Sequence, residues 1–238
     1  MRYKVDCHIH SESSFDGRMS VDEIIKTARA RGLNVIAITD HDGYYDGNTE
    51  DFEVIRGCEF STEYGHLLGL FMTEPIIVKD FHKIVVAVHK QGGLVVLAHP
   101  YQRRNMEEKV EHIAHLIDGV EVFNSRAAKK NKEANRQATA LADRHGLLYF
   151  AGSDSHLTRE LGNVILTCEG EDIRSALTEG FISIEGKHSD PVNTARSQFT
   201  RFKNAGWTPK TFIKWCLFAA KCIFSKKEKE NVLISKDR

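Results

Sequence analysis

Residues 3–10 read YKVDCHIH, residues 20–31 read SVDEIIKTARAR, and residues 35–41 read VIAITDH. The outer two runs are rich in β-branched and other apolar residues, as strands are, whereas the middle run repeats its apolar residues at helical spacing. A strand, a helix and a second strand in this order predict a parallel pair joined by a crossover helix.

The same alternation continues along the chain. Helices are expected over 80–91, 106–117, 127–145 and 171–179, and NVILT (163–167) and FISIEG (181–186) follow as weaker strands. The other strand-like runs are VIRGCEF (54–60), HLLGLF (66–71), LVVLAHP (94–100), GVEVFN (119–124) and LLYFAGSDSH (147–156). About seven strands before residue 156 favour a closed or nearly closed β/α barrel, and no GxGxxG or GxxxxGK[ST] loop supports nucleotide binding of the Rossmann or P-loop kind.

Helix ends carry their own signals. Ser20 and Glu23 form a capping-box pattern, and Asp80 is placed to cap the next helix. Glycines stand where helices should end, at Gly32, Gly92 and Gly146.

Composition indicates an ordinary globular protein. The 238 residues include 33 basic and 33 acidic side chains and are 41% hydrophobic, which excludes disordered, collagen-like and coiled-coil classes. With no net charge, recognition of a polyanion must depend on a local patch. The five cysteines form no CxxC motif, and the first ten residues lack the pattern of a signal peptide, so we expect free thiols and a cytoplasmic location.

The sequence changes character near residue 189, so we expect a barrel over 1–188 and an extension over 189–238. Within the extension, TFIKWCLFAAKCIF (211–224) is apolar apart from Lys214 and Lys221, and its 14 residues are too few to span a bilayer. It is interpreted either as a helix docked on the barrel or as an interfacial membrane helix, with peripheral contact through 207–224. The last residues, KKEKENVLISKDR (226–238), are expected to fray.

Histidines and acids collect at the ends of the predicted strands. His8 and His10 are two residues apart on one strand, so both imidazoles point to one face and can bind one metal ion. Asp154 and His156 repeat this spacing at the end of the seventh strand. Asp16, which precedes a glycine, is either a turn former or a further ligand.

The second and third strands end in ionisable groups as well. Asp40, His41 and Asp42 follow an apolar run that has no structural use for three such groups, at the end where barrels place their chemistry. Glu59 closes another apolar strand, where a buried carboxylate is unfavourable unless it is paired or bound to metal.

His66 starts its strand and His99 ends one. Residues 62–65 can close a hairpin that brings His66 beside Glu59. The alternative interpretation is that His66 is an interior histidine with a structural role. Pro100, directly after His99, stops strand pairing there.

With HIH, FDG, TDHD, GCEFS, GHLLGL, LAHP, VEVFN and GSDSH in this order, the chain resembles the PHP (polymerase and histidinol phosphatase) family over residues 3 to about 186. Because no polymerase module follows, it is most similar to the stand-alone phosphoesterases of that family. The resemblance implies an α/β fold, namely a distorted (β/α)7 barrel of the TIM-like kind, with a metal centre at the C-terminal ends of its strands.

The resemblance also implies a ligand set and a cofactor of two or three divalent ions, of Mn, Fe or Zn. His8, His10, Glu59 and Asp154 would hold the first ion, Glu59 with His66 and His99 the second, and Asp16 with His41 and His156 the third. Many members of the family have histidine where this chain has Asp16. The helical insertion that caps the substrate in some relatives is missing between Glu59 and His99.

Such a centre implies in-line attack on phosphorus by a metal-bridging hydroxide. Three divalent ions outweigh three carboxylates, so the centre favours a phosphate ester over a neutral amide. Asp42, and His41 or His156 where metal does not engage them, are candidates for the acid that protonates the leaving group. Four residues that follow strands are candidates for substrate binding, unless they only face solvent: Arg103, Arg104, Asn124 and Arg126.

The expected function is therefore metal-dependent phosphoester hydrolysis, on a small nucleotide or a short oligonucleotide. A histidinol-phosphate-type monoesterase is the alternative within the same class. An amidohydrolase and a non-enzymatic metal-binding module fit less well, since Glu59 takes the place of a bridging lysine and no ligand is lost.

Overall fold

One sheet organises the protein. The computed structural model describes residues 1–47, 49, 51–129, 131–224 and 231–236. The sheet has ten strands in the order β10-β9-β8-β1-β2-β3-β4-β5-β6-β7. The strands are β1 (Arg2–Ile9), β2 (Val35–Ile38), β3 (Glu53–Thr62), β4 (Gly65–Leu70), β5 (Leu94–Ala98), β6 (Gly119–Asn124), β7 (Leu148–Gly152), β8 (Val164–Glu169), β9 (Ile182–Lys187) and β10 (Asn231–Lys236).

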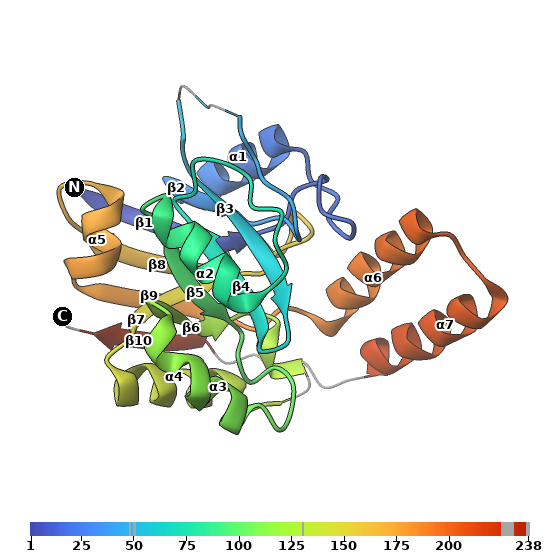
Figure 1. Ribbon diagram of the computed structural model, residues 1–238. Helices are drawn as coiled ribbons and strands as arrows, with labels where there is room; N and C mark the ends of the chain where they lie inside the picture. Colours follow the sequence, from blue (N-terminus) through green and yellow to red (C-terminus); the bar gives the residue numbers. More distant parts are fainter. Residues whose placement is uncertain (48, 50, 130, 225–230, 237–238) are drawn as a thin grey trace.

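Helices connect most of the strands (Figure 1). They are α1 (Val21–Ala30), α2 (Phe81–Lys90), α3 (Glu107–Ile113), α4 (Ala134–His145), α5 (Ile173–Glu179), α6 (Pro191–Ala205) and α7 (Pro209–Phe224), with short 3₁₀ turns at Ala114–Leu116 and Ala127–Lys129. The predicted cap signals are confirmed. The Ser20 and Glu23 capping box and the Asp80 cap are both formed, and the three glycines have positive φ.

The sheet curls so that its seventh strand returns to its first. Strands β1 to β7 are neighbours in chain order, and all these pairs are parallel except those that β4 makes with β3 and β5. Ile9 at the end of β1 forms a parallel bridge with Ser155, just beyond β7. The His10 backbone N–H donates to the carbonyl oxygen of Ser155 over 2.9 Å.

The mixed α/β architecture agrees with the prediction, whereas the regular alternation of a (β/α)7 barrel is not kept. Strand β4 is antiparallel because a tight hairpin, pairing Thr62 with Gly65, turns the chain back directly after β3. None of the described residues between β2 and β3 is helical.

The sheet extends beyond the curled part. Strand β8 pairs antiparallel with the first half of β1, β9 pairs with β8, and β10 pairs with β9 from Asn231 opposite Lys187 to Lys236 opposite Ile182. The prediction of a frayed end is therefore wrong for 231–236, which form an edge strand; residues 226–230 and 237–238 lie outside the described residues.

Strand β2 shows why the fold is stable. All four of its residues are buried, and side chains alternate between the two faces of a strand. Val35 and Ala37 belong to the main core, whereas Ile36 and Ile38 pack in a second cluster with Ile24 of α1. Burial on both faces fixes the register of β2 and the position of the residues that follow it.

Helices α6 and α7 form an arm that extends from the sheet (Figure 1). The indole N–H of Trp215 in α7 donates to the carbonyl oxygen of Ala195 in α6 over 2.9 Å. The segment predicted as apolar is thus a helix, but it packs on α6 and leaves large side chains such as Leu217 and Phe224 exposed. Within the described chain, no helix combines the length and the apolar character that a membrane span needs.

Candidate metal centre

The structure brings the nine predicted ligands to one edge of the curled sheet. Residues at or just after the ends of parallel strands meet at one edge. His66 joins them because β4 is antiparallel, so its first residues lie at the same edge; Ser61 of β3 pairs with His66. The hairpin predicted from residues 62–65 is confirmed, and His66 Nδ1 lies 2.6 Å from Glu59 Oε1.

Four donor atoms converge at the end of β1. His8 Nε2 and His10 Nε2 are 3.1 Å apart. Glu59 Oε2 lies 3.5 and 3.3 Å from these two nitrogens, and Asp154 Oδ1 lies 3.8 and 3.4 Å from them. Ligand atoms of a tetrahedral ion with bonds of about 2.1 Å are spaced about 3.4 Å apart. The atoms of His8, His10 and Glu59 therefore have the spacing that one divalent ion needs, and Asp154 lies beside both imidazoles.

Glu59 is the centre of the cluster. Its Oε1 faces His66 Nδ1 and lies 3.1 Å from His99 Nε2, whereas its Oε2 lies 2.9 Å from His41 Nδ1. The side chain is 1% exposed. A buried carboxylate with imidazoles on both oxygens is placed to bridge two ions.

Two buried atoms of this cluster lack hydrogen bonds. Glu59 Oε2 and His41 Nδ1 approach each other but are not aligned, and neither has a hydrogen-bond partner among the described residues. A buried polar atom without a partner is unfavourable by about 1–3 kcal/mol. Metal ligation would satisfy both atoms, so the residues present fit divalent ions that take nitrogen and oxygen ligands.

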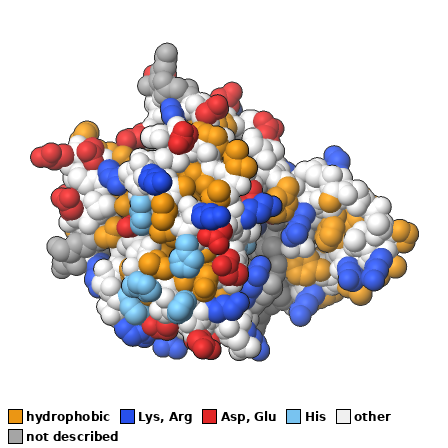
Figure 2. Space-filling view, in the orientation of Figure 1, with side chains coloured by type: hydrophobic (Ala, Val, Ile, Leu, Met, Phe, Trp, Pro, Cys, Tyr) orange, Lys and Arg blue, Asp and Glu red, His pale blue; other side chains and the backbone are white. Residues whose placement is uncertain are grey.

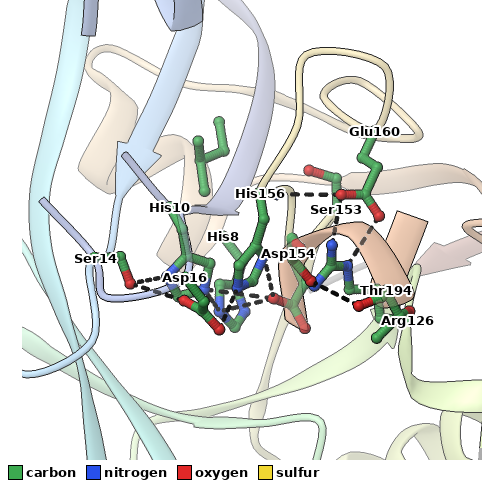
Figure 3. A network of polar contacts seen from close by, with 12 residues as sticks. His8, His10, Ser14, Asp16, Arg126, Ser153, Asp154, His156, Glu160 and Thr194 are labelled. Carbon is green, nitrogen blue, oxygen red and sulfur yellow. Dashed lines mark hydrogen bonds and ion pairs between the residues drawn. The ribbon is translucent and has the colours of Figure 1, made fainter. Parts of the chain in front are cut away.

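A further group of donors surrounds Asp16. Donor atoms of His10, Asp16, His41 and His156 all lie within 4.8 Å of one another. Asp16 Oδ2 is 3.2 Å from His156 Nε2, and Asp16 Oδ1 is 3.9 Å from His41 Nε2. Asp16 is thus a cluster residue as well as a turn residue (Figure 3).

Burial and charge shift the pKa values in the cluster. Burial, helped by the nearby His156, lowers the pKa of His10 to about 3 and keeps its imidazole neutral, which is the form that binds metal. Burial opposes charge on Glu59 and Asp154 too, but the surrounding histidines outweigh it and hold both carboxyl pKa values well below their usual range. Both carboxylates are therefore ionised and ready to bind cations.

The backbone is strained where it presents ligands. His99 has a φ of 30° and Asp154 a φ of 52°, in the left-handed region that non-glycine residues rarely adopt. Asp42, beside His41, has a φ of 50°. Such strain persists only where surrounding structure enforces it, and it concentrates at functional sites.

Glu121 of β6 belongs to the cluster and was not predicted from the sequence. Its Oε1 is 3.1 Å from His8 Nδ1, and its Oε2 accepts the His99 backbone N–H over 2.9 Å. It therefore holds the His8 ring with Nε2 directed at the donor group, as carboxylates behind metal-binding histidines do. An acid inside the apolar run GVEVFN was the available signal, the same one that identified Glu59.

The two aspartates of the TDHD segment, Asp40 and Asp42, have different surroundings. Asp40 is buried, and its two oxygens accept the backbone N–H and the hydroxyl of Ser11, each over 2.6 Å. It braces the loop that carries Asp16. Asp42 is exposed, and its backbone N–H donates to the Glu59 carbonyl oxygen over 3.0 Å.

The predicted substrate-binding residues lie in three different environments. Asn124 is buried, and its amide donates to Glu121 Oε2 over 2.9 Å. Arg126 is buried too and donates through Nε and Nη2 to both oxygens of Glu160, over 2.9 and 2.6 Å. Arg103 and Arg104 are exposed in the loop after β5. The side chains of Asn124 and Arg126 therefore form hydrogen bonds inside the protein rather than pointing into solvent.

The ion pair of Arg126 and Glu160 supports the end of β7 (Figure 3). Glu160 Oε2 also accepts the backbone N–H of His156 over 3.2 Å. Arg126 Nη1 donates to the hydroxyl of Ser197 in α6 over 3.3 Å. The pair thus connects the loop after β6, the His156 segment and α6.

Comparison with known proteins gives matches along most of the chain. An uncharacterized protein of Methanocaldococcus jannaschii is 33% identical over 172 residues, which cover 68% of this chain and 69% of that protein. A probable phosphatase of Acetivibrio thermocellus is 24% identical, with 68% of this chain and 83% of the relative covered. The crystal structure of PsfC from Pseudomonas syringae has the same fold, with a TM-score of 0.62 at 15% identity and coverage of 85% and 98%.

The match to a family model covers the part of the chain that carries the ligand cluster. The model of the PHP domain family matches residues 6–205, which include all nine predicted ligands and α6. The chain belongs to the PHP domain family.

Proposed function

We propose that this protein is a metal-dependent phosphoesterase that hydrolyses phosphate esters of a small nucleotide or a short oligonucleotide. The observation that carries the proposal is the convergence of His8, His10 and Glu59 at the spacing of one metal ion, with Asp154 beside both imidazoles. The probable phosphatase among the relatives supports the same reaction class.

In this proposal the nine ligands divide among up to three metal ions, and Glu59 is shared by two of them. His8, His10, Glu59 and Asp154 would hold one ion, Glu59 with His66 and His99 a second, and Asp16 with His41 and His156 a third. Two or three ions of Mn, Fe or Zn would supply a hydroxide nucleophile at neutral pH and neutralise the phosphoryl oxygens.

The protein's own groups then orient the ligands and move the proton. Glu121 fixes the ring of His8, and Asp40 holds the Asp16 loop through Ser11. Asp42 is exposed, whereas His41 and His156 face Glu59 and Asp16. Asp42, and His41 or His156 where a metal ion would not engage them, are therefore our candidates for the group that protonates the leaving oxygen.

A basic hollow beside the cluster supports a substrate with more than one phosphate. Arg18, Arg159 and Arg196 line it, with Glu23 as the acidic member of the wall. Arg18 follows Asp16 by two residues and Arg159 follows His156 by three, so the hollow adjoins two loops that carry proposed ligands. Guanidinium groups bind phosphate through paired hydrogen bonds.

The test is a substrate panel with defined metals. Nucleoside monophosphates, cyclic nucleotides, 3′,5′-bisphosphates, short RNA and DNA, and histidinol phosphate are each assayed with Mn, Zn or Mg, and Glu59→Gln serves as the background control. Turnover of nucleotide substrates by wild type alone supports the proposal. Hydrolysis of histidinol phosphate alone would show that the proposed nucleotide substrate is wrong. A failure to hydrolyse any phosphate ester would contradict the proposed phosphoesterase function.

A further inference from the structure

We propose that the outer face of α7 binds membrane surfaces that contain anionic phospholipids. We define this face by five large apolar side chains with exposed fractions from 49% to 88%: Phe212, Ile213, Leu217, Ile223 and Phe224. Soluble monomers rarely leave so many large apolar side chains together on one surface without a partner.

Helical geometry explains why these side chains form one face. With 3.6 residues per turn, positions 212, 213, 217, 220, 223 and 224 project to the same side of α7. The opposite side packs on α6, where Cys222 is buried and Trp215 donates to the Ala195 carbonyl oxygen. The packing of the arm therefore leaves the outer face free of contact with α6.

Basic residues border this face. Lys210, Lys214 and Lys221 lie on one side of α7, next to Leu217, and all three are exposed. Residues 191–224 contain six Lys and Arg and no Asp or Glu. In Figure 2 the arm shows hydrophobic and basic side chains and no acidic ones.

The charge of the arm contrasts with that of the rest of the chain. Of the 33 basic residues, six lie in 191–224 and 27 elsewhere, against 33 acidic residues that all lie elsewhere. The arm thus has a formal charge of +6 and the remainder −6. The two or three divalent ions of the proposed function would offset most of the negative charge of the remainder, whereas the arm would keep its positive charge. An anionic surface would therefore attract the arm, which orients the protein.

The chemistry of the outer face fits lipid better than nucleic acid or a second copy. Three of its five side chains, Ile213, Leu217 and Ile223, are aliphatic and cannot stack on bases, and the ring of Phe212 already packs against Trp207 with centroids 5.5 Å apart. Trp207, which could stack, packs against Phe199 at 5.3 Å between ring centroids. A symmetric antiparallel dimer through this face would bring the lysine rows of two copies together. An apolar face with lysines along its edge is typical of helices that lie in the membrane interface.

The arm is attached to the metal centre's loop. Asn204 Nδ2 donates to the Phe15 carbonyl oxygen over 3.0 Å, and the Arg201 guanidinium lies 5.1 Å from the centroid of the Phe15 ring. Phe15 in turn stacks on His41 with centroids 4.7 Å apart. Membrane binding through α7 would therefore hold the catalytic edge at a fixed place near the surface.

Co-sedimentation of the full-length protein with vesicles tests the proposal. We expect binding to phosphatidylcholine vesicles that contain phosphatidylglycerol, weaker binding to phosphatidylcholine alone, and release at high salt. Leu217→Glu should reduce binding by about tenfold or more, because its side chain would no longer enter the apolar layer. Replacing Lys210, Lys214 and Lys221 with Gln should reduce it about five-fold per residue, on the order of 100-fold in total.

Matched controls lie on and near α2. Val86→Glu changes another exposed apolar residue, 51% exposed, and Lys79, Lys83 and Lys90 are three other exposed lysines for replacement with Gln. Both controls should bind vesicles as wild type does, and circular dichroism should show that every variant is folded.

Three outcomes would overturn the proposal. One is the absence of vesicle binding by the wild-type protein, and another is equal binding to neutral and anionic vesicles. The third is an alternative occupant: a dimer that Leu217→Glu dissociates, or single-stranded nucleic acid that binds more tightly than vesicles and is lost only in the lysine variant. Because none of these measurements depends on hydrolysis, failure of the proposed enzymatic function leaves the test intact.

Discussion

At the scale of single residues, the metal centre depends most on Glu59. Its two oxygens face different histidines, and its position on β3, next to the β4 hairpin, brings His66 within 2.6 Å. No other carboxylate of the cluster contacts as many of the proposed ligands among the described residues. A residue that bridges two ions should therefore matter more than one that binds a single ion.

The comparison of Glu59→Gln with Asp16→Asn tests this ranking. We expect Glu59→Gln to lower kcat by about a thousandfold or more, since loss of one charge weakens two sites, and Asp16→Asn to lower it by about 10–100-fold. Steady-state kinetics at saturating metal measure both. Equal losses would show that the bridging and terminal roles are assigned wrongly.

Glu121 is predicted to tune metal binding without contacting the substrate. Glu121→Gln removes the charge behind the ring of His8, so metal affinity should fall about 10–100-fold, while excess metal should restore most of the activity. Isothermal titration of the metal-free protein provides the affinity, with the exposed Glu107→Gln as a control. An unchanged affinity would limit Glu121 to a structural role.

At the scale of elements, a buried ion pair holds the parts of the site together. Arg126 follows β6 and Glu160 lies between β7 and β8, and their side chains are 7% and 0% exposed. Removing one member of a buried pair leaves an uncompensated charge, which typically destabilises a protein by about 3–5 kcal/mol.

Glu160→Gln should therefore lower the free energy of unfolding by several kcal/mol, because Arg126 keeps its charge and loses its partner. Chemical denaturation monitored by circular dichroism measures this. The control is Glu133→Gln, which breaks the exposed pair with Arg136 and should change stability by less than about 1 kcal/mol. Similar effects for the two variants would mean that the buried pair contributes no more than a surface pair.

The basic hollow next to α6 leads to a prediction about substrate binding. Arg159→Gln and Arg196→Gln should each raise KM for a 3′,5′-bisphosphate about tenfold, because a charge-assisted hydrogen bond is lost, and should leave KM for a monophosphate unchanged. Arg136→Gln, on the exposed surface of α4, is the control. A parallel rise for both substrates would place the arginines away from the distal phosphate.

Local patterns in the sequence predicted the strands and helices that carry the ligands. Some of the features that were not predicted depend on contacts between distant parts of the chain. His8 lies in the last residues of β1, and His10, His99 and Asp154 follow strands, so the strand ends alone indicated where they meet. Glu121 was missed although its strand shows the same signal. Glu160 stands in an irregular loop with no pattern of its own, and β10 depends on pairing with β9, whose residues lie 44 to 54 positions earlier in the chain.

At the scale of the whole molecule, the fold separates two surfaces with different chemistry. The curled sheet gathers acids and histidines at the catalytic edge, whereas the arm carries only basic and uncharged side chains. The arm is connected to the catalytic edge through Phe15 and through the hydrogen bond between Ser197 and Arg126. Because Phe212, Leu217 and the other side chains of the outer face of α7 are not among these connecting residues, substitutions there should alter the proposed membrane binding without changing the metal centre.

The central claim is that the cluster around Glu59 holds more than one metal ion. Elemental analysis by mass spectrometry of the full-length protein, reconstituted with Mn, Fe or Zn and freed of unbound ions, measures this directly. The account predicts at least two ions per chain for wild type and fewer for Glu59→Gln. One ion or none in the wild-type protein after reconstitution would contradict it.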